Sequence, residues 1–135
     1  MTTQDSPQPT EIRLHQKSRI LEIAFSDGSR FELPCEFLRV YSPSAEVRGH
    51  GPGQEVLVVG KKNVEITAIE PVGTYAINLV FSDGHDSGIY SWSYLYDLGK
   101  NKEALWQRYL ERLAAAGASR EPTAESPIPI RPKSK

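Results

Sequence analysis

The tripeptide Ser-Asp-Gly occurs twice in this sequence, each time directly after a short apolar segment. Ser26–Gly28 follows residues 20–25, and Ser82–Gly84 follows residues 76–81. Asp-Gly pairs supply the positive φ angles that a tight turn between antiparallel strands requires, and apolar residues resume after each copy. Each copy therefore predicts a β-hairpin, and two such hairpins favour a fold rich in antiparallel sheet.

The similarity between the two halves extends beyond the turns. Glu11–Arg13 precedes the first turn as Glu65–Thr67 precedes the second, and Phe37–Leu38 follows the first as Tyr94–Leu95 follows the second. We therefore predict that a unit of strand, loop, strand, turn, strand and short aromatic turn occurs twice. Two interpretations stay open: an internal duplication, or independent use of a tripeptide that hairpins favour.

Residues 11–98 are predicted to form strands and turns, with further short strands at Val56–Val59 and Asn63–Ile69. One helix follows, with Asn101 as its expected N-cap and Gly117 as its left-handed closing residue. Its apolar stripe, expected to pack on the sheet, comprises Leu105, Trp106, Tyr109, Leu110 and Leu113. The predicted fold class is α+β, mainly β: small antiparallel sheets from two pseudo-repeated Ser-Asp-Gly hairpin units with one C-terminal helix.

The chain of 135 residues fits one domain, which we place at residues 11–117. Polar segments that contain proline flank it, and neither has enough apolar surface to offset the entropy of ordering. We expect residues 1–10 and 118–135 to be disordered. The second segment has a small excess of positive charge, which is more typical of a solvated end than of a binding arm.

Composition argues against several classes of protein. The 16 Lys and Arg residues against 17 Asp and Glu residues give a net charge of −1, which removes the electrostatic case for nucleic-acid binding. No apolar segment approaches the ~20 residues that cross a bilayer, and the N-terminal residues lack a signal-peptide pattern, so we expect a cytoplasmic protein without membrane contact. The sequence indicates no oligomeric state.

Four residues are candidate metal ligands: His85, His50, Asp83 and Cys35. Two histidines in different loops, with Asp83 beside one of them, form a nitrogen and oxygen set that suits zinc or iron. The simpler interpretation makes the histidines solvated loop residues, Asp83 a turn residue and Cys35 a small buried apolar side chain. No Ser-centred elbow, phosphate-binding loop or His-Glu-x-x-His helix pattern is present, so we expect no enzyme activity.

Two further segments have patterns that bear on function. Tyr90, Trp92, Tyr94 and Tyr96 alternate with other residues, so an extended segment would place all four on one face. That face is either a binding platform or part of the core, and the core is favoured because a domain with only one Met and four Phe residues needs its aromatic residues inside. Tyr41–Gln54 is rich in proline and glycine and is predicted to be a long loop, a type that often makes functional contacts.

Three segments resemble the family named for the N-terminal domain of gamma-butyrobetaine hydroxylase: Leu33–Glu46, Asn63–Gly73 and Phe81–Trp92. The resemblance spans about residues 10–100. It implies that this chain corresponds to the domain that precedes the catalytic domain of the hydroxylases, which holds iron and 2-oxoglutarate. Hydroxylase activity is therefore not expected here.

The resemblance also concerns a metal. In the hydroxylases this domain binds zinc through three closely spaced cysteines and a distant histidine. The histidine matches His85, whereas the cysteine positions fall on Ser42, Ser44 and Val47, so the resemblance implies that this zinc site is lost. Similar domains are also attached to P-loop ATPases that carry iron–sulfur clusters, and small bacterial members stand alone.

We therefore expect a non-catalytic accessory domain that contacts another protein through the Tyr41–Gln54 loop and the turn at His85. The alternative is a metal-binding protein, linked to iron or iron–sulfur handling, with His85 as a ligand to one iron or zinc ion.

Overall fold

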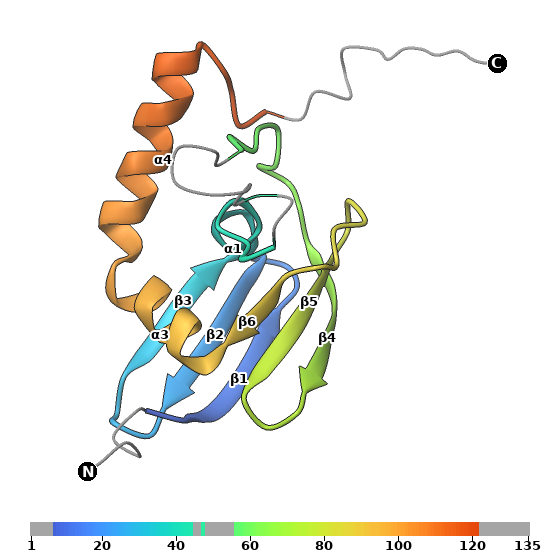
Figure 1. Cartoon of the computed structure of the whole chain (residues 1–135), viewed down its shortest axis with the longest axis vertical. Coiled ribbons are helices and arrows are strands. Elements are labelled where there is room, and N and C mark those ends of the chain that lie inside the picture. Colours follow the sequence, from blue (N-terminus) through green and yellow to red (C-terminus); the bar gives the residue numbers. More distant parts are fainter. Residues whose placement is uncertain (1–6, 45–46, 48–55, 122–135) are drawn as a thin grey trace, which may run out of the picture.

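The computed structural model describes residues 7–44, 47 and 56–121. These residues form two three-stranded antiparallel sheets, in each of which neighbouring strands follow one another along the chain (Figure 1). The sheets consist of β1 (Pro9–His15), β2 (Ile20–Phe25) and β3 (Arg30–Pro34), and of β4 (Ile66–Val72), β5 (Ala76–Phe81) and β6 (Ile89–Ser91). The α+β, mainly β fold class is confirmed, and so are the two predicted hairpin turns.

The described residues contain three helices: α1 (Cys35–Val40), α3 (Trp92–Lys100) and α4 (Lys102–Ala116). The expectation of one C-terminal helix was therefore incomplete. Helix α4 is present and Gly117 closes it at φ 65°, but a short helix also follows the last strand of each sheet. At α3 the reason is Ser91, whose hydroxyl accepts the backbone N–H of Tyr94 and caps the helix, so Trp92, Tyr94 and Tyr96 are helical and only Tyr90 is extended.

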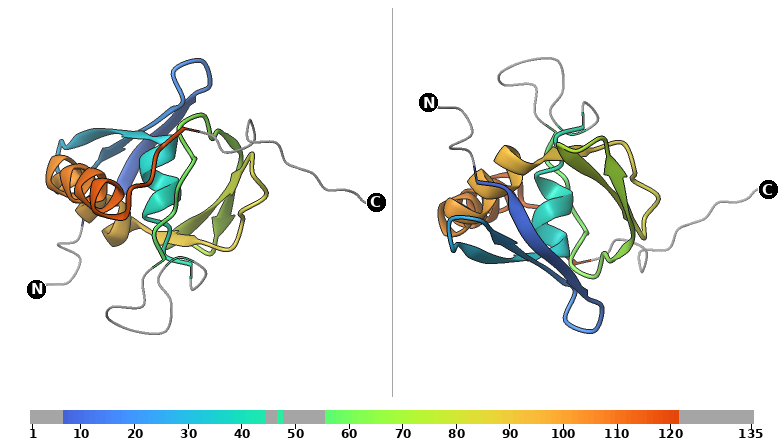
Figure 2. Two further views of the ribbon diagram at one scale, coloured as in Figure 1. Left: turned by 90° about the horizontal axis from the view of Figure 1, so that it is seen from above. Right: turned by 90° about the horizontal axis from the view of Figure 1, so that it is seen from below.

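Helix α1 lies between the two sheets, as both views in Figure 2 show. A single core cluster contains buried residues of both sheets, of α1 and of α3. Phe37 and Leu38 of α1 and Tyr90 of β6 are each at most 1% exposed, and the Tyr90 hydroxyl donates to the Leu38 carbonyl at 2.6 Å. The alternating aromatic residues pack in or against this core, as expected.

Helix α4 covers the outer side of α1. A second cluster of buried residues, Val40, Tyr109 and Leu113, joins the two helices. The apolar stripe of α4 was expected to pack on the sheet. Only its first part, Leu105 and Trp106, contacts the main core, because α1 lies between the rest of α4 and the strands.

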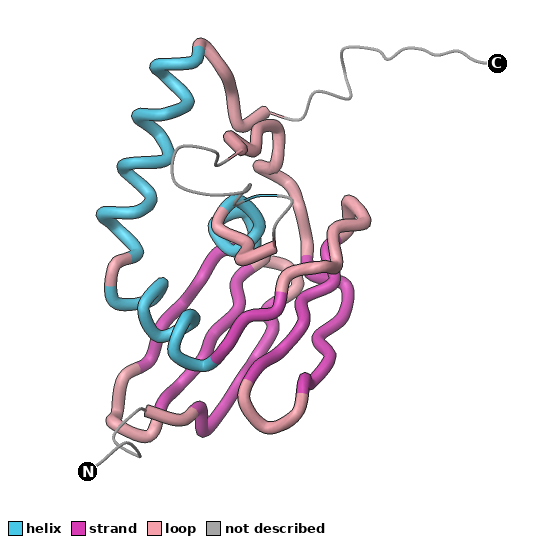
Figure 3. The backbone as a smooth tube through the Cα atoms, in the orientation of Figure 1, coloured by secondary structure: helices cyan, strands magenta, loops and turns pink. Residues whose placement is uncertain are grey.

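The two halves share their local geometry, with the order strand, strand, strand, helix in each (Figure 3). Gly28 and Gly84 have φ angles of 91° and 92°. The carboxylates of Asp27 and Asp83 accept the backbone N–H two residues further on, at 2.9 and 3.1 Å. Positive φ at the glycine and this Asx contact define the same turn twice.

The predicted correspondence between Glu11–Arg13 and Glu65–Thr67 is wrong. A β-bulge interrupts the first strand pair of each half, and after it Glu11 pairs with Ala24 as Ala68 pairs with Val80. Glu11 therefore corresponds to Ala68. The bulge adds a residue to one strand without a recognisable sequence signal.

Two of the predicted strands differ from the strands in the structure. Val56–Val59 is irregular, because the Val56 N–H donates to the Val47 carbonyl and the Val58 carbonyl accepts the Tyr109 hydroxyl in place of a strand partner. Strand β4 begins at Ile66 and continues through Pro71 to Val72, beyond the predicted end at Ile69. Proline is tolerated there because β4 is an outer strand of its sheet.

The described part of the chain extends slightly beyond residues 11–117. Strand β1 begins at Pro9, and Ser119 and Arg120 accept the backbone N–H groups of Gly60 and Lys62 at 3.1 and 3.0 Å. Residues 1–6 and 122–135 of the two flanking segments lie outside the described residues. Among the described helices, none is both long and apolar enough to cross a membrane.

Candidate functional site

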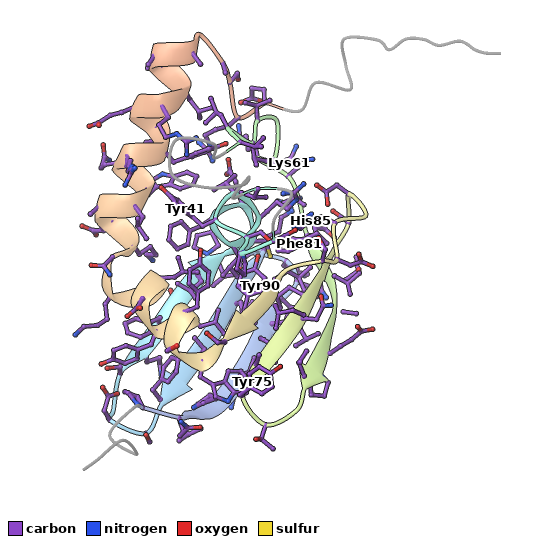
Figure 4. The ribbon with its side chains drawn as sticks, viewed as in Figure 1. Tyr41, Lys61, Tyr75, Phe81, His85 and Tyr90 are labelled. Carbon is purple, nitrogen blue, oxygen red and sulfur yellow. The ribbon has the colours of Figure 1, made fainter. Side chains whose placement is uncertain are left out.

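The first candidate site is a buried polar pair that connects the two halves. After α1 ends, the chain turns at Tyr41 and places Ser42 beside His85, which follows the second Ser-Asp-Gly turn. Figure 4 labels Tyr41 and His85 in this region. Ser42 Oγ lies 2.9 Å from His85 Nε2, and the two residues are 1% and 7% exposed. The imidazole therefore holds the end of α1 against the second sheet.

The absence of a side chain at Gly88 makes this contact possible. A Cβ at that position would overlap Ser42 Oγ and would lie 3.2 Å from the Tyr90 ring. Ser42 Oγ also accepts the backbone N–H of Ser44 at 3.2 Å, and the hydroxyl groups of Ser44 and Ser87 lie 2.7 Å apart. The hydroxyl, amide and imidazole groups thus form hydrogen bonds with one another inside the protein, and these hydrogen bonds offset the free-energy cost of removing the groups from water.

The cysteine positions of the relatives, as the resemblance implies them, fall in this region. Ser42 and Ser44 lie at His85, and the Val47 N–H donates to the Ser44 carbonyl at 3.0 Å. Zinc sites of this type need thiolate and imidazole ligands. Two hydroxyl groups and an isopropyl group do not fit that ion, and His85 Nε2 is within hydrogen-bond distance of Ser42.

Of the other predicted ligands, Asp83 accepts the His85 backbone N–H, and Cys35 lies at the opposite end of α1 from Ser42. Cys35 begins α1 and Ser42 follows two residues after its end, and the helix alone separates its first and last residues by about 7.5 Å along its axis at 1.5 Å per residue. Burial raises the pKa of the Cys35 thiol, as is typical of an inert buried cysteine. His50 lies outside the described residues, and no group of three or more His, Cys, Asp and Glu side chains in the described part is placed to hold a metal.

Asp83 forms a charge cluster beside this pair. Its carboxylate lies 2.9 Å from Arg39 Nε and 2.6 Å from Lys61 Nζ, and it accepts the His85 backbone N–H. Burial alone would raise the pKa of this carboxyl group, but the Lys61 ammonium, the His85 N–H and the Arg39 guanidinium together lower it to about 2. Asp83 therefore joins α1 to the second turn, in addition to its expected role within that turn.

The second candidate site is a groove on the surface between α1 and α4. It has a volume of about 470 Å³ and is lined by three apolar and three polar residues: Pro34, Phe37 and Trp106, and Lys102, Glu103 and Gln107. The rings of Phe37 and Trp106 meet edge to face with their centroids 6.3 Å apart. Apolar and aromatic lining with a few polar groups is the usual composition of a ligand or peptide site.

Arg120, which follows α4, contacts the ring of Trp106, one of the residues that line the groove. Its guanidinium group lies 5.2 Å from the centroid of the Trp106 ring and makes two hydrogen bonds to the Glu36 carboxylate, at 2.8 and 2.7 Å. Glu36 is 6% exposed, so its charge requires such a partner. The chain after α4 is therefore attached to α1 next to the aromatic lining.

The groove was not predicted from the sequence. The sequence pattern puts Trp106 in the apolar stripe of the helix together with Tyr109 and Leu113, which are buried. Periodicity shows which face of a helix is apolar, but it does not show which part of that face a neighbouring element leaves uncovered. No feature of the sequence separates Trp106 from the rest of the stripe.

Comparison with known proteins gives a family and several similar structures. The sequence model of the family described as gamma-butyrobetaine hydroxylase-like, N-terminal, matches residues 12–96. No curated protein matches the chain.

Two solved structures, each described only as an NMR solution structure, are similar to this chain. One is 57% identical, with a TM-score of 0.76, and covers 100% of this chain and 98% of its own. The other is 50% identical, also with a TM-score of 0.76, and covers 87% and 92%. A crystal structure of a protein of unknown function in the DUF971 family, from Acidithiobacillus ferrooxidans ATCC 23270, is 41% identical with a TM-score of 0.58 and covers 68% of this chain and 92% of its own.

The substitution Ser42→Ala is expected to lower the free energy of unfolding by about 1–3 kcal/mol, because it removes a buried hydrogen-bond partner of both His85 and the Ser44 N–H. Urea denaturation measures the loss. Ser93→Ala, at an exposed serine, is the matched control and should change stability by less than about 0.5 kcal/mol. Equal effects of the two substitutions would contradict the role of the buried pair.

The stability that Asp83 contributes is expected to depend on pH. Because its pKa is about 2 in the folded chain against 3.8 for an unperturbed aspartate, the contribution is complete above about pH 5 and is lost as the pH falls through 2. Asp83→Asn should therefore destabilise the protein at neutral pH, and denaturation curves of variant and wild type should converge towards pH 2. A difference that does not change with pH would contradict this prediction.

Proposed function

This chain belongs to the gamma-butyrobetaine hydroxylase-like, N-terminal family, and on that premise we propose that it is a non-catalytic interaction domain that binds a proline-rich segment of another protein beside Trp106. The observation that carries the proposal is the aromatic groove, which the described residues leave open. Proline-rich segments dock in aromatic-lined grooves because their extended conformation is largely formed before binding and loses little entropy.

The buried pair supports a non-catalytic role. A hydroxyl group beside an imidazole is the arrangement of a nucleophile and its base. Here, however, Ser42 is 1% exposed and His85 is 7% exposed, so a substrate has no access to the hydroxyl group in the folded domain. The contact serves to fix α1 and the second turn.

The Tyr41–Gln54 loop was expected to form the contact surface, and most of it lies outside the described residues. Its first residue lies next to α4, since the Tyr41 hydroxyl donates to the Leu105 carbonyl at 2.7 Å. We therefore retain the start of this loop, with the turn at His85, as a second part of the proposed contact surface.

The alternative function is the binding of one iron or zinc ion by His85, with His50, Asp83 and Cys35 as further ligands. The contacts of His85 with Ser42 and of Asp83 with Arg39 favour the interaction domain instead. We expect elemental analysis of the protein purified without a histidine tag to find no stoichiometric iron or zinc. A stoichiometric metal that is lost in the His85→Ala variant would establish the alternative.

The substitution Trp106→Ala is expected to weaken peptide binding about tenfold or more, because a central aromatic residue commonly dominates such an interface. The probe is a fluorescein-labelled synthetic peptide with two Pro-x-x-Pro repeats, and fluorescence anisotropy measures its affinity. Trp106→Phe should keep most of the affinity. Tyr75→Ala, at a tyrosine that is 59% exposed in the β4–β5 turn, is the control and should leave it unchanged.

Circular dichroism of each variant shows whether the fold is retained. If the peptide binds all of these folded proteins equally, or binds none of them, the proposed function is wrong.

A further inference from the structure

We propose that the C-terminal segment of this same chain, residues 127–132, docks in the groove beside Trp106 and competes there with the external partner. The inference rests on the proposed function, because it assigns a regulator to the same groove. It is supported by where the described chain ends, by the length of the remaining segment and by the chemistry of its residues.

The described chain ends next to the groove. Backbone hydrogen bonds from Gly60 and Lys62 fix Ser119 and Arg120, and the Arg120 guanidinium group lies 5.2 Å from the centroid of the Trp106 ring. The two hydrogen bonds from Arg120 to the nearly buried Glu36 hold this position. Any segment that follows Glu121 therefore starts within one arginine side chain of the aromatic lining.

The chain between Glu121 and Pro127 is long enough for the segment to reach the Trp106 ring. Residues 122–126 lie between the last described residue, Glu121, and Pro127. In an extended polyproline conformation each residue advances about 3.1 Å, so the step from Glu121 to Pro127 spans up to about 19 Å. Because the side chain of Arg120 alone reaches the Trp106 ring, this tether is longer than the gap that it has to bridge.

The segment has the composition of a groove ligand. Pro127 and Pro129 alternate with Ile128 and Ile130, Pro132 follows Arg131, and Pro129 and Pro132 have the Pro-x-x-Pro spacing. In a polyproline helix, which has a three-residue period, both prolines would face the same side. Such a ligand presents apolar ridges to an aromatic groove.

The charges at the groove are complementary to this segment. Glu103 lines the groove, and Arg131 and Lys133 belong to the segment or follow it directly. Lys102 also lines the groove, but its ammonium group donates to the Glu32 carbonyl at 2.8 Å, which directs that charge towards β3. A carboxylate beside an aromatic groove favours a proline-rich ligand that carries a basic residue.

Because the C-terminal segment is attached to the domain, even a weak intrinsic affinity is enough for it to occupy the groove. A short flexible tether gives the segment an effective concentration on the order of 1 mM at the groove. An intrinsic dissociation constant of about 0.3 mM would then occupy roughly three-quarters of the molecules and weaken the binding of an external peptide about fourfold. The segment would therefore adjust the affinity of the groove without blocking it.

The test is paramagnetic broadening in the full chain. A nitroxide label is attached to a Ser134→Cys variant, and the wild-type chain treated in the same way controls for labelling of Cys35, which is 1% exposed. The label is expected to remove more than half of the Trp106 indole N–H signal. The indole signal of Trp92 should keep its intensity, because Trp92 lines a different depression with Pro7 and Tyr75.

The matched variant is Ile128→Ser with Ile130→Ser in the labelled chain. It keeps the tether and the label but removes the apolar side chains, so broadening at Trp106 should decrease at least twofold. Equal broadening in both chains, or no broadening in the first, overturns the proposal. A mixture of labelled and unlabelled chains tests for docking between molecules. If the label broadens the Trp106 signal of other chains and not that of its own chain, the proposal is also overturned, because the segment then docks on a second copy.

The peptide titration separates this inference from the proposed function. The synthetic Pro-x-x-Pro peptide should bind the Ile128→Ser and Ile130→Ser double variant severalfold more tightly than it binds the wild type. Equal binding to both proteins would overturn the inference and leave the proposed function intact. No binding to either protein would overturn the proposed function itself.

Discussion

The burial of α1 between the two sheets determines where both candidate sites lie. Phe37 and Leu38 place this short helix in the common core, and the Leu38 carbonyl accepts the hydroxyl of Tyr90 from the second sheet. Once α1 is fixed, its end brings Ser42 to His85, and its outer side forms the groove with α4. Six residues of helix therefore connect the hydrophobic core, the buried polar pair and the proposed binding surface.

Two ion pairs reinforce this position from outside the core. Arg39 of α1 contacts Asp83, and Glu36 of α1 contacts Arg120 beyond α4. An unpaired charge at either place would cost several kcal/mol, because the carboxylates are partly or almost completely removed from water. These ion pairs consequently determine how the second turn and the last described residues attach to α1, in addition to any contribution that they make to stability.

Local patterns predicted the parts of this fold that depend on neighbouring residues. Asp27 and Asp83 with the glycines that follow them were sufficient to locate both hairpins, and Gly117 was sufficient to end α4. Helices α1 and α3 were not predicted, because short helices depend on tertiary packing more than on propensity, and the aromatic alternation from Tyr90 is also compatible with a strand. Neither the contact of Ser42 with His85 nor the groove has a local signature, since each unites residues that are distant in sequence.

The shared core has a consequence for the relation between the two halves. Each half is one layer, a three-stranded sheet followed by a short helix, and the apolar face of each layer is covered by the other. A layer of this kind has no core of its own when it is alone. An isolated half would therefore expose the apolar face that the other half covers, so we expect that neither half folds without the other.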